Sequence, residues 1–153
     1  MAEKRAQPID KFPKTVFEWN DEYLIGVTAI DQQHKHWFAL GERFHHAVAT
    51  GKGKAMLDEL LEALVRYTNA HFHVEERLMA SIDYPEREQH IAQHRDLVER
   101  LKDFQHRFES GDTAMTIQVL QFLSRWLITH TTTTDRQLGQ YHRSGAKQTI
   151  TTG

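Results

Sequence analysis

The chain has 153 residues, a formal net charge of −2 and no cysteine. This length fits one domain, and the lack of cysteine excludes disulfides, thiolate metal sites and a cysteine nucleophile. The balanced charge provides no basic field for nucleic acid, and no apolar run reaches the roughly 18 residues that span a bilayer. Histidine is the outlier with 11 residues, so a metal site has to be built from imidazole and carboxylate groups.

The two ends of the chain differ from its body. Residues 1–15 are rich in proline and basic residues but have no apolar signal region, which predicts an irregular arm on a cytoplasmic protein. Phe17, Trp19 and Tyr23 make the segment after this arm too apolar for a free tail, so we expect residues 16–30 to pack along the domain. Residues 143–153 are small and polar and predict a mobile tail.

The body of the chain, residues 16–142, predicts four helices. Asp31 and Asp112 are suitable N-caps, and Pro85 occupies a favoured first-turn position. Short connections force neighbouring helices to run antiparallel, so the expected fold is an all-α, up-down-up-down antiparallel four-helix bundle. The four predicted ranges are about Asp31 to Gly51, Lys54 to Ser81, Pro85 to Gly111 and Asp112 to Tyr141.

Polar side chains interrupt the apolar stripes of the first three predicted helices. His71 and Glu75 occupy stripe positions otherwise held by leucine, and His90 and His94 continue a seam of leucines. His34 leads the stripe of the first helix. Residues four apart lie about 40° apart on a helix, so each pair presents two ligand atoms to one point. Because buried imidazole and carboxylate groups are costly unless paired or bound to metal, these positions indicate a metal site.

The fourth predicted helix carries His130 and Asp135, which are five residues apart. In a regular α-helix they differ by about 140° and flank the buried arc centred on Leu127 from opposite sides. A local π-bulge would narrow this gap. The remaining histidines are expected on solvated faces or helix ends, although His45 falls on the first stripe; they are His36, His45, His46, His73, His106 and His142.

The motifs assembled in this way resemble those of the hemerythrins, in particular the single-domain bacterial hemerythrins. They are DQQH at 31–34, HFHVEE at 71–76, HIAQH at 90–94 and WLITHTTTTD at 126–135. The resemblance implies a non-haem di-iron centre with an oxo or hydroxo bridge, which binds dioxygen reversibly. It implies that one iron binds His90, His94 and His130, that the other binds His34 and His71 and keeps an open position, and that Glu75 and Asp135 bridge the two.

The resemblance also indicates the wall of an oxygen pocket. The residue after the helix-four histidine is usually a bulky aliphatic one in this family, whereas this chain has Thr131. Thr131 lies about 40° from Leu127 on the core arc, so we expect its hydroxyl near the oxygen site. The expected wall consists of Trp37, Phe38, Phe72, Trp126, Leu127 and Thr131.

Several functions are compatible with such a site. We rank an oxygen carrier or store first, then an oxygen or redox sensor that reports to a partner. A di-iron enzyme handling peroxide or nitric oxide comes third, because nothing in the sequence places a general acid or a reductant-docking surface. A metal-free bundle comes last, since it needs the aligned ligands by accident. We therefore expect a monomeric non-enzyme whose partners are dioxygen and an unidentified oxygen acceptor or reductase, with no nucleic acid and no membrane.

Overall fold

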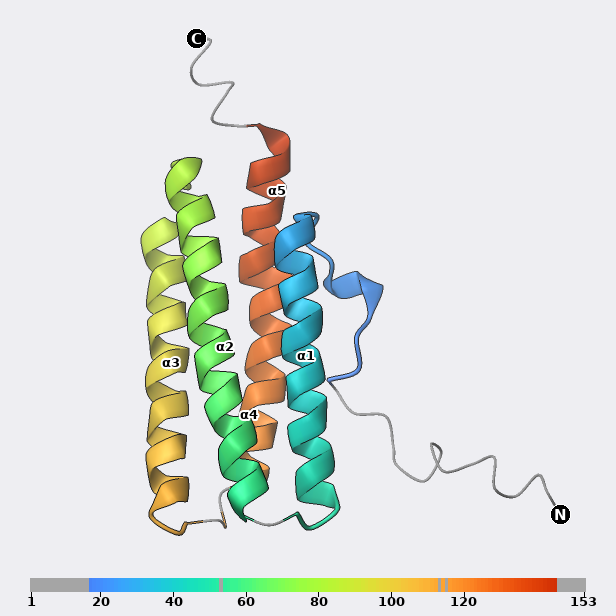
Figure 1. The fold of residues 1–153 in the computed structure, drawn as a ribbon. Coiled ribbons are helices and arrows are strands. Elements are labelled where there is room, and N and C mark those ends of the chain that lie inside the picture. The colour runs from blue at the N-terminus through green and yellow to red at the C-terminus, as the bar shows by residue number, and fades with distance from the viewer. Residues whose placement is uncertain (1–16, 53, 113, 115, 146–153) are drawn as a thin grey trace, which may run out of the picture.

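All the regular secondary structure in the described part of the chain is helical. The computed structural model describes residues 17–52, 54–112, 114 and 116–145, so the predicted arm at 1–15 and most of the predicted tail lie outside the described residues. Four long rods run antiparallel (Figure 1), which confirms the predicted four-helix bundle. The elements are the 3-10 helix η3 (Asp21–Tyr23), α1 (Thr28–Ala49), α2 (Lys54–Ser81), α3 (Arg87–Glu109), α4 (Thr116–Thr129), the π-helix η4 (His130–Asp135) and α5 (Arg136–Ser144).

The fourth rod is composite. In it, α4, η4 and α5 follow one another without a break, and the six residues of η4 form the π-helical turn that narrows the gap between His130 and Asp135. The rod continues to Ser144, where Gly145 ends it in the left-handed conformation at φ 65°. Ser144 therefore still belongs to the bundle, two residues beyond the predicted boundary.

Three predicted helix starts were wrong. The first rod begins at Thr28, so Asp31 lies inside its first turn and does not cap it. The Asp31 carboxylate instead accepts hydrogen bonds from the backbone N–H groups of Ile25 and Gly26, at 2.8 and 3.1 Å. The third rod begins at Arg87 rather than Pro85, which lies in the preceding turn. The fourth begins at Thr116, and Asp112 pairs with Arg107 at 3.2 Å rather than capping it.

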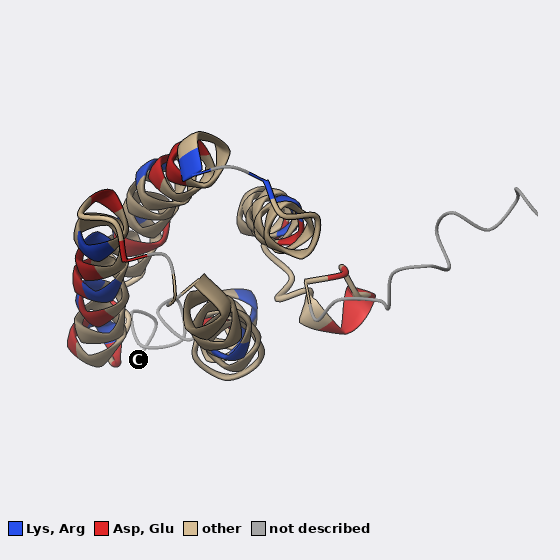
Figure 2. Ribbon diagram, turned by 90° about the horizontal axis from the view of Figure 1, so that it is seen from below, with Lys and Arg blue, Asp and Glu red and all other residues tan. Residues whose placement is uncertain are grey.

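The core consists of apolar side chains from all four rods, including Trp37, Leu64, Leu97 and Leu123. Such residues recur along each rod because a helical stripe about 100° wide faces the interior of a bundle. Viewed from below, the rods appear nearly end on and the N-terminal segment lies against them (Figure 2). Within the described residues, no helix is both long and apolar enough to cross a membrane.

The N-terminal segment packs on the bundle, as expected for its apolar residues. Phe17 is buried against Gly41, where a Cβ atom would come within 2.4 Å of the Phe17 ring. The rings of Trp19 and Tyr23 contact that of Phe38, with centroids 5.5 and 5.0 Å apart. The segment therefore covers the outer side of α1 and helps to close the core.

Candidate metal centre

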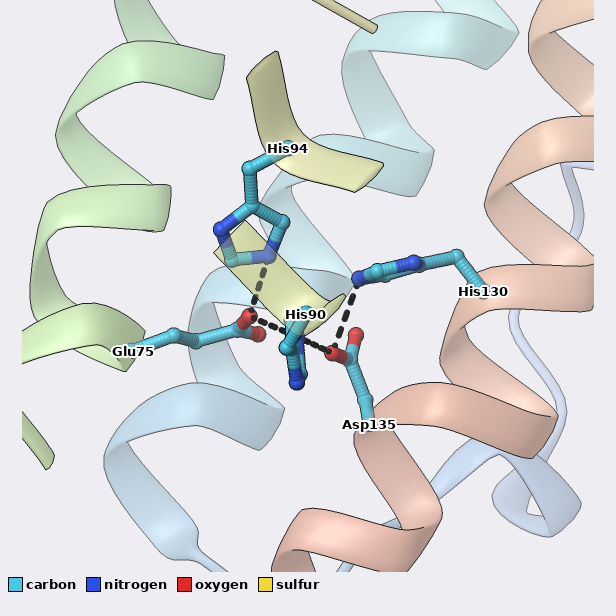
Figure 3. A group of neighbouring side chains, drawn as sticks. All are labelled: Glu75, His90, His94, His130 and Asp135. Carbon is cyan, nitrogen blue, oxygen red and sulfur yellow. Dashed lines mark hydrogen bonds and ion pairs between the residues drawn. The ribbon is translucent and has the colours of Figure 1, made fainter. Parts of the chain in front are cut away.

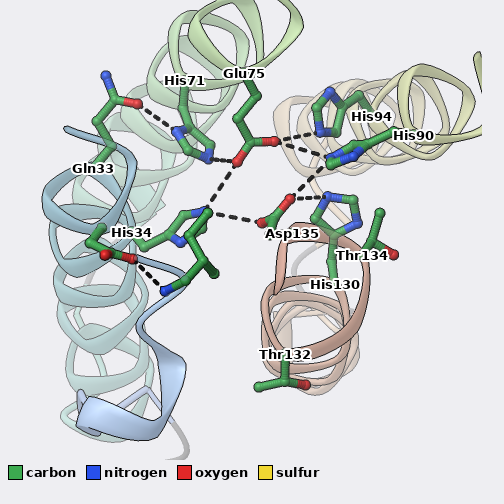
Figure 4. A network of polar contacts seen from close by, with 12 residues as sticks. Gln33, His34, His71, Glu75, His90, His94, His130, Thr132, Thr134 and Asp135 are labelled. Carbon is green, nitrogen blue, oxygen red and sulfur yellow. Dashed lines mark hydrogen bonds and ion pairs between the residues drawn. The ribbon is translucent and has the colours of Figure 1, made fainter. Parts of the chain in front are cut away.

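Seven buried side chains that can bind metal meet in the middle of the bundle (Figures 3 and 4). They form two groups, and within each group one ligand atom per residue lies within 4.8 Å of all the others. The groups share Glu75 and Asp135, so the seven residues describe two adjoining cation sites. The first group is Glu75, His90, His94, His130 and Asp135, and the second is His34, His71, Glu75 and Asp135.

Each shared carboxylate divides its two oxygen atoms between the groups. Glu75 directs Oε2 to His71 at 2.9 Å and to His34 at 3.3 Å. Its Oε1 faces His94 at 3.0 Å and His90 at 3.2 Å. Asp135 repeats the arrangement from the opposite rod, with Oδ2 at 3.1 Å from His34. Its Oδ1 lies 3.0 Å from His90 and 3.1 Å from His130. Two carboxylates oriented in this way can bridge two cations.

Several ligand atoms in this cluster have no hydrogen-bond partner. Nε2 of His71, His94 and His130 and both oxygens of Asp135 are buried without one among the described residues, although each lies 2.9–3.1 Å from a carboxylate oxygen or an imidazole nitrogen of the cluster. The imidazole nitrogens and carboxylate oxygens are therefore near one another without the geometry of a hydrogen bond. Buried polar atoms left unpaired cost free energy, and a cation between them removes that cost. The donor set consequently fits metal ions.

Three of the five histidines are oriented by acceptors behind them. The Nδ1 atoms of His71 and His130 are each 2.8 Å from a carboxamide oxygen, those of Gln33 and Gln93 respectively. Nδ1 of His94 is 2.9 Å from the Glu76 carboxylate. An imidazole that donates from Nδ1 has its lone pair on Nε2, as a metal ligand requires. We did not predict these partners, although each of them directly adjoins a predicted ligand in the sequence.

Neighbouring histidines and carboxylates in the cluster shift one another's pKa values. Burial alone would lower the pKa of His34, but the carboxylates of Asp135 and Glu75 raise it to about 10. The same opposing effects raise the pKa of His90 to about 9. Burial favours the neutral form of Glu75, yet His71 and the other histidines around it hold its pKa well below the ordinary value. Without metal, protons on His34 and His90 thus balance the two buried carboxylates.

Aromatic rings surround the cluster on several sides. Phe72 stacks on His94 with ring centroids 3.6 Å apart, and Trp126 stacks on His130 at 4.2 Å. The Trp37 ring lies 5.3 Å from that of His71. The ring contacts of Phe38 are with Trp19 and Tyr23 instead, so its predicted place in the pocket wall receives no support from these contacts.

Two further residues of the predicted pocket wall lie beside His130 on the fourth rod. Leu127 is fully buried, as is Thr131. The Oγ1 atom of Thr131 has no hydrogen-bond partner among the described residues. The other six histidines belong to neither group; five are exposed, and His45 is half-buried.

Comparison with known proteins identifies similar chains. Residues 25–141 match the family of hemerythrin HHE cation binding domains. The bacteriohemerythrin of Stenotrophomonas maltophilia strain R551-3 is 33% identical over 112 residues, which cover 73% of this chain and 72% of the relative. The bacteriohemerythrin of Methylococcus capsulatus strain Bath is 30% identical over 118 residues, or 77% and 89% of the two chains. A crystal structure of wild-type hemerythrin superposes with a TM-score of 0.75 at 29% identity, covering 80% of this chain and 94% of the other.

Proposed function

Because this chain belongs to the hemerythrin family, we propose that it binds dioxygen reversibly at a pair of iron ions held by the seven buried side chains. Members of this family bind oxygen rather than catalyse a reaction, which confirms the expectation that the chain is not an enzyme. The observation that carries the proposal is the division of the Glu75 and Asp135 oxygens between two groups of histidines.

The donor set favours two iron ions over one zinc ion. Structural zinc is bound by four ligands around one ion, whereas seven side chains in two overlapping groups suit two ions. Imidazole and carboxylate ligands suit iron, and the chain has no thiolate to compete. Ferritin-like di-iron sites use more carboxylates and fewer histidines. Five neutral imidazoles with two carboxylates give a less anionic shell, which supports a stable ferrous pair.

The two groups differ in how many ligands they supply. One group has three histidines and the other has two, and both share the same pair of carboxylates. The group of His34 and His71 therefore leaves more of its metal's coordination sphere open. When bound, the iron pair supplies the electrons that hold dioxygen reversibly. We place the dioxygen position on this side of the centre.

Aromatic side chains surround both groups of the centre. Trp37 is fully buried beside His71, and Phe72 and Trp126 cover the histidines of the other group. Excluding water from such a site suppresses proton leakage and loss of the bound ligand. Since all seven candidate ligands come from one bundle, one chain suffices to form the site, and we expect a monomer.

Metal content and visible absorption test the proposal. The protein, loaded with ferrous iron under argon, should hold two iron ions per chain. Its absorption should change on admission of air and return under vacuum over repeated cycles. One zinc ion per chain, or iron that oxidises once without a reversible change, would refute the proposal.

Two alanine variants separate the site from the other histidines. His71→Ala should lose dioxygen binding and at least one metal ion, because His71 is one of only two histidines in its group. His106→Ala is the matched control, since His106 is exposed at the end of α3 and belongs to neither group. Equal losses in both variants would contradict the assignment.

A further inference from the structure

A surface groove lies in the seam between α3 and α4, next to the candidate centre. It has a volume of about 500 Å³, which is within the range of small-molecule sites. Its lining includes Gln93 and Arg100 from α3, and Phe122, Arg125 and Trp126 from α4. The rods pack most closely between α1 and α2 and between α2 and α3, so this seam is one of the looser ones.

The groove combines aromatic rings with positive charge. The guanidinium of Arg100 lies over the Phe122 ring at 5.1 Å and pairs with Asp96 at 3.3 Å. Arg125 makes no ion pair within the described residues, and α4 contains no acidic residue. Guanidinium groups bind phosphate through paired hydrogen bonds and also stack on planar rings. A planar aromatic molecule with a phosphate group matches both features.

A candidate iron ligand itself lines the groove, since His130 lies in its wall beside Trp126. Trp126 lines the groove and stacks on His130, with centroids 4.2 Å apart and an interplanar angle of 15°. On its inner side, Trp126 also contacts Trp37 at 6.1 Å. His130 itself is held by Gln93, which reaches it from the groove. A molecule in the groove therefore lies against the ring of a candidate ligand, which offers electrons a short path into the centre.

We propose that the groove between α3 and α4 binds a reduced flavin phosphate, which re-reduces the oxidised iron pair through Trp126 and His130. This inference rests on the proposed function. If the bound oxygen leaves as peroxide, it takes two electrons from the iron pair, which is then diferric and has to be reduced again. With two ferric ions held by the seven candidate ligands, the flavin hydroquinone anion would supply two electrons, one for each ion, and would release its N–H proton to water. No bond to the metal forms or breaks.

Binding of oxidised flavin mononucleotide to the full chain tests whether the groove is a flavin phosphate site. We expect saturable quenching of the flavin fluorescence, with riboflavin, which lacks the phosphate, binding about tenfold more weakly. The double variant Arg100→Gln/Arg125→Gln should weaken binding of the phosphate form by about tenfold and weaken riboflavin binding much less. If the two flavins bind equally, or neither binds, the proposal is wrong.

A matched control distinguishes this groove from general positive charge. Arg95 is exposed and lines a separate groove between α2 and α3, so Arg95→Gln removes one charge at a different place. It should leave binding of flavin mononucleotide unchanged. An equal loss in Arg95→Gln and in Arg125→Gln would show non-specific attraction and overturn the proposal.

Electron transfer from the flavin to the iron pair is tested on the diferric protein under argon. Dithionite-free reduced flavin mononucleotide should bleach the visible absorption of the iron pair, and Arg100→Gln/Arg125→Gln should slow this several-fold at low ionic strength. Unchanged rates would overturn the electron route. Failure of the proposed function leaves flavin binding by the full chain measurable, whereas failure of this inference leaves reversible oxygen binding intact.

Discussion

Nε2 of His130 lies 3.1 Å from Oδ1 of Asp135, and these two residues are the first and last of a six-residue π-helix. In a regular α-helix, residues five apart point about 140° away from each other. The wider turn of a π-helix accommodates one extra residue, so the fifth residue takes the place that the fourth has elsewhere. Both side chains therefore enter the centre from a single rod.

Deleting one threonine of the π-helix should preserve the centre. Thr133 is exposed, and its hydroxyl bonds only to the Thr129 carbonyl, at 2.6 Å. After its deletion, the histidine and the aspartate are four apart, and a regular α-helix places them about 40° apart on one face. We expect two iron ions per chain by metal analysis and a melting temperature no lower than that of the parent.

Inserting an alanine after Thr133 is the opposite change. The histidine and aspartate are then six apart, and neither an α-helix nor one π-turn brings them together. This variant should lose the iron group that contains His130 while remaining helical by circular dichroism. A deletion variant that folds but loses iron, or an insertion variant that keeps it, contradicts this account of the rod.

The acceptor behind His94 should control metal affinity. Glu76 receives the Nδ1 proton of His94 at 2.9 Å, and outer partners of this kind typically contribute 10–100-fold in metal affinity. Glu76→Leu should weaken iron binding by about that factor in competition with a chelator, whereas Glu76→Gln, which keeps an acceptor oxygen, should lose less. Glu99→Leu is the control, because Glu99 is exposed and lines the same groove between α2 and α3 as Glu76. Similar losses in Glu76→Leu and Glu99→Leu would rule out this role.

The sequence could predict which side chains form the centre but not how they are arranged within it. His71, Glu75, His90 and His94 were recognisable because helical spacing alone places each pair on one face. Pairing of His130 with Asp135 depends on a π-helix, which no local propensity specifies. The orientation of Gln93 toward His130, on a different rod, depends on tertiary packing.

The ends of the elements were less predictable for a similar reason. A short polar side chain before a helix can cap it or bond to other backbone groups nearby. Asp31 does the latter, because the chain turns back at Gly26 and brings two N–H groups to its carboxylate. Phe38 belongs to the apolar stripe of α1, but only the packed N-terminal segment determines that its ring contacts Trp19 and Tyr23.

Replacing Thr131 should change both stability and the lifetime of bound oxygen. Its buried hydroxyl has no partner among the described residues, so the nearly isosteric Thr131→Val should raise the free energy of unfolding by about 1 kcal/mol in urea titrations. Thr131→Ile restores a bulky aliphatic side chain beside His130 and should slow the decay of the oxygenated absorption. Unchanged or faster decay in Thr131→Ile would count against a hydroxyl near the oxygen position.

The stability of the metal-free protein should fall at alkaline pH. His34 lies 3.1 Å from Asp135 and 3.3 Å from Glu75, which raise its pKa from 6.5 to about 10 against the effect of burial. A raised folded-state pKa stabilises the fold fully below pH 6.5, and this contribution disappears as the pH rises toward 10. Since one unit of pKa corresponds to about 1.4 kcal/mol, the chelator-treated protein should lose more than about 1 kcal/mol between pH 6.5 and 10 in urea titrations. Iron takes the place of these protons, so the iron-loaded protein should show little loss, and identical profiles for the two forms would refute the prediction.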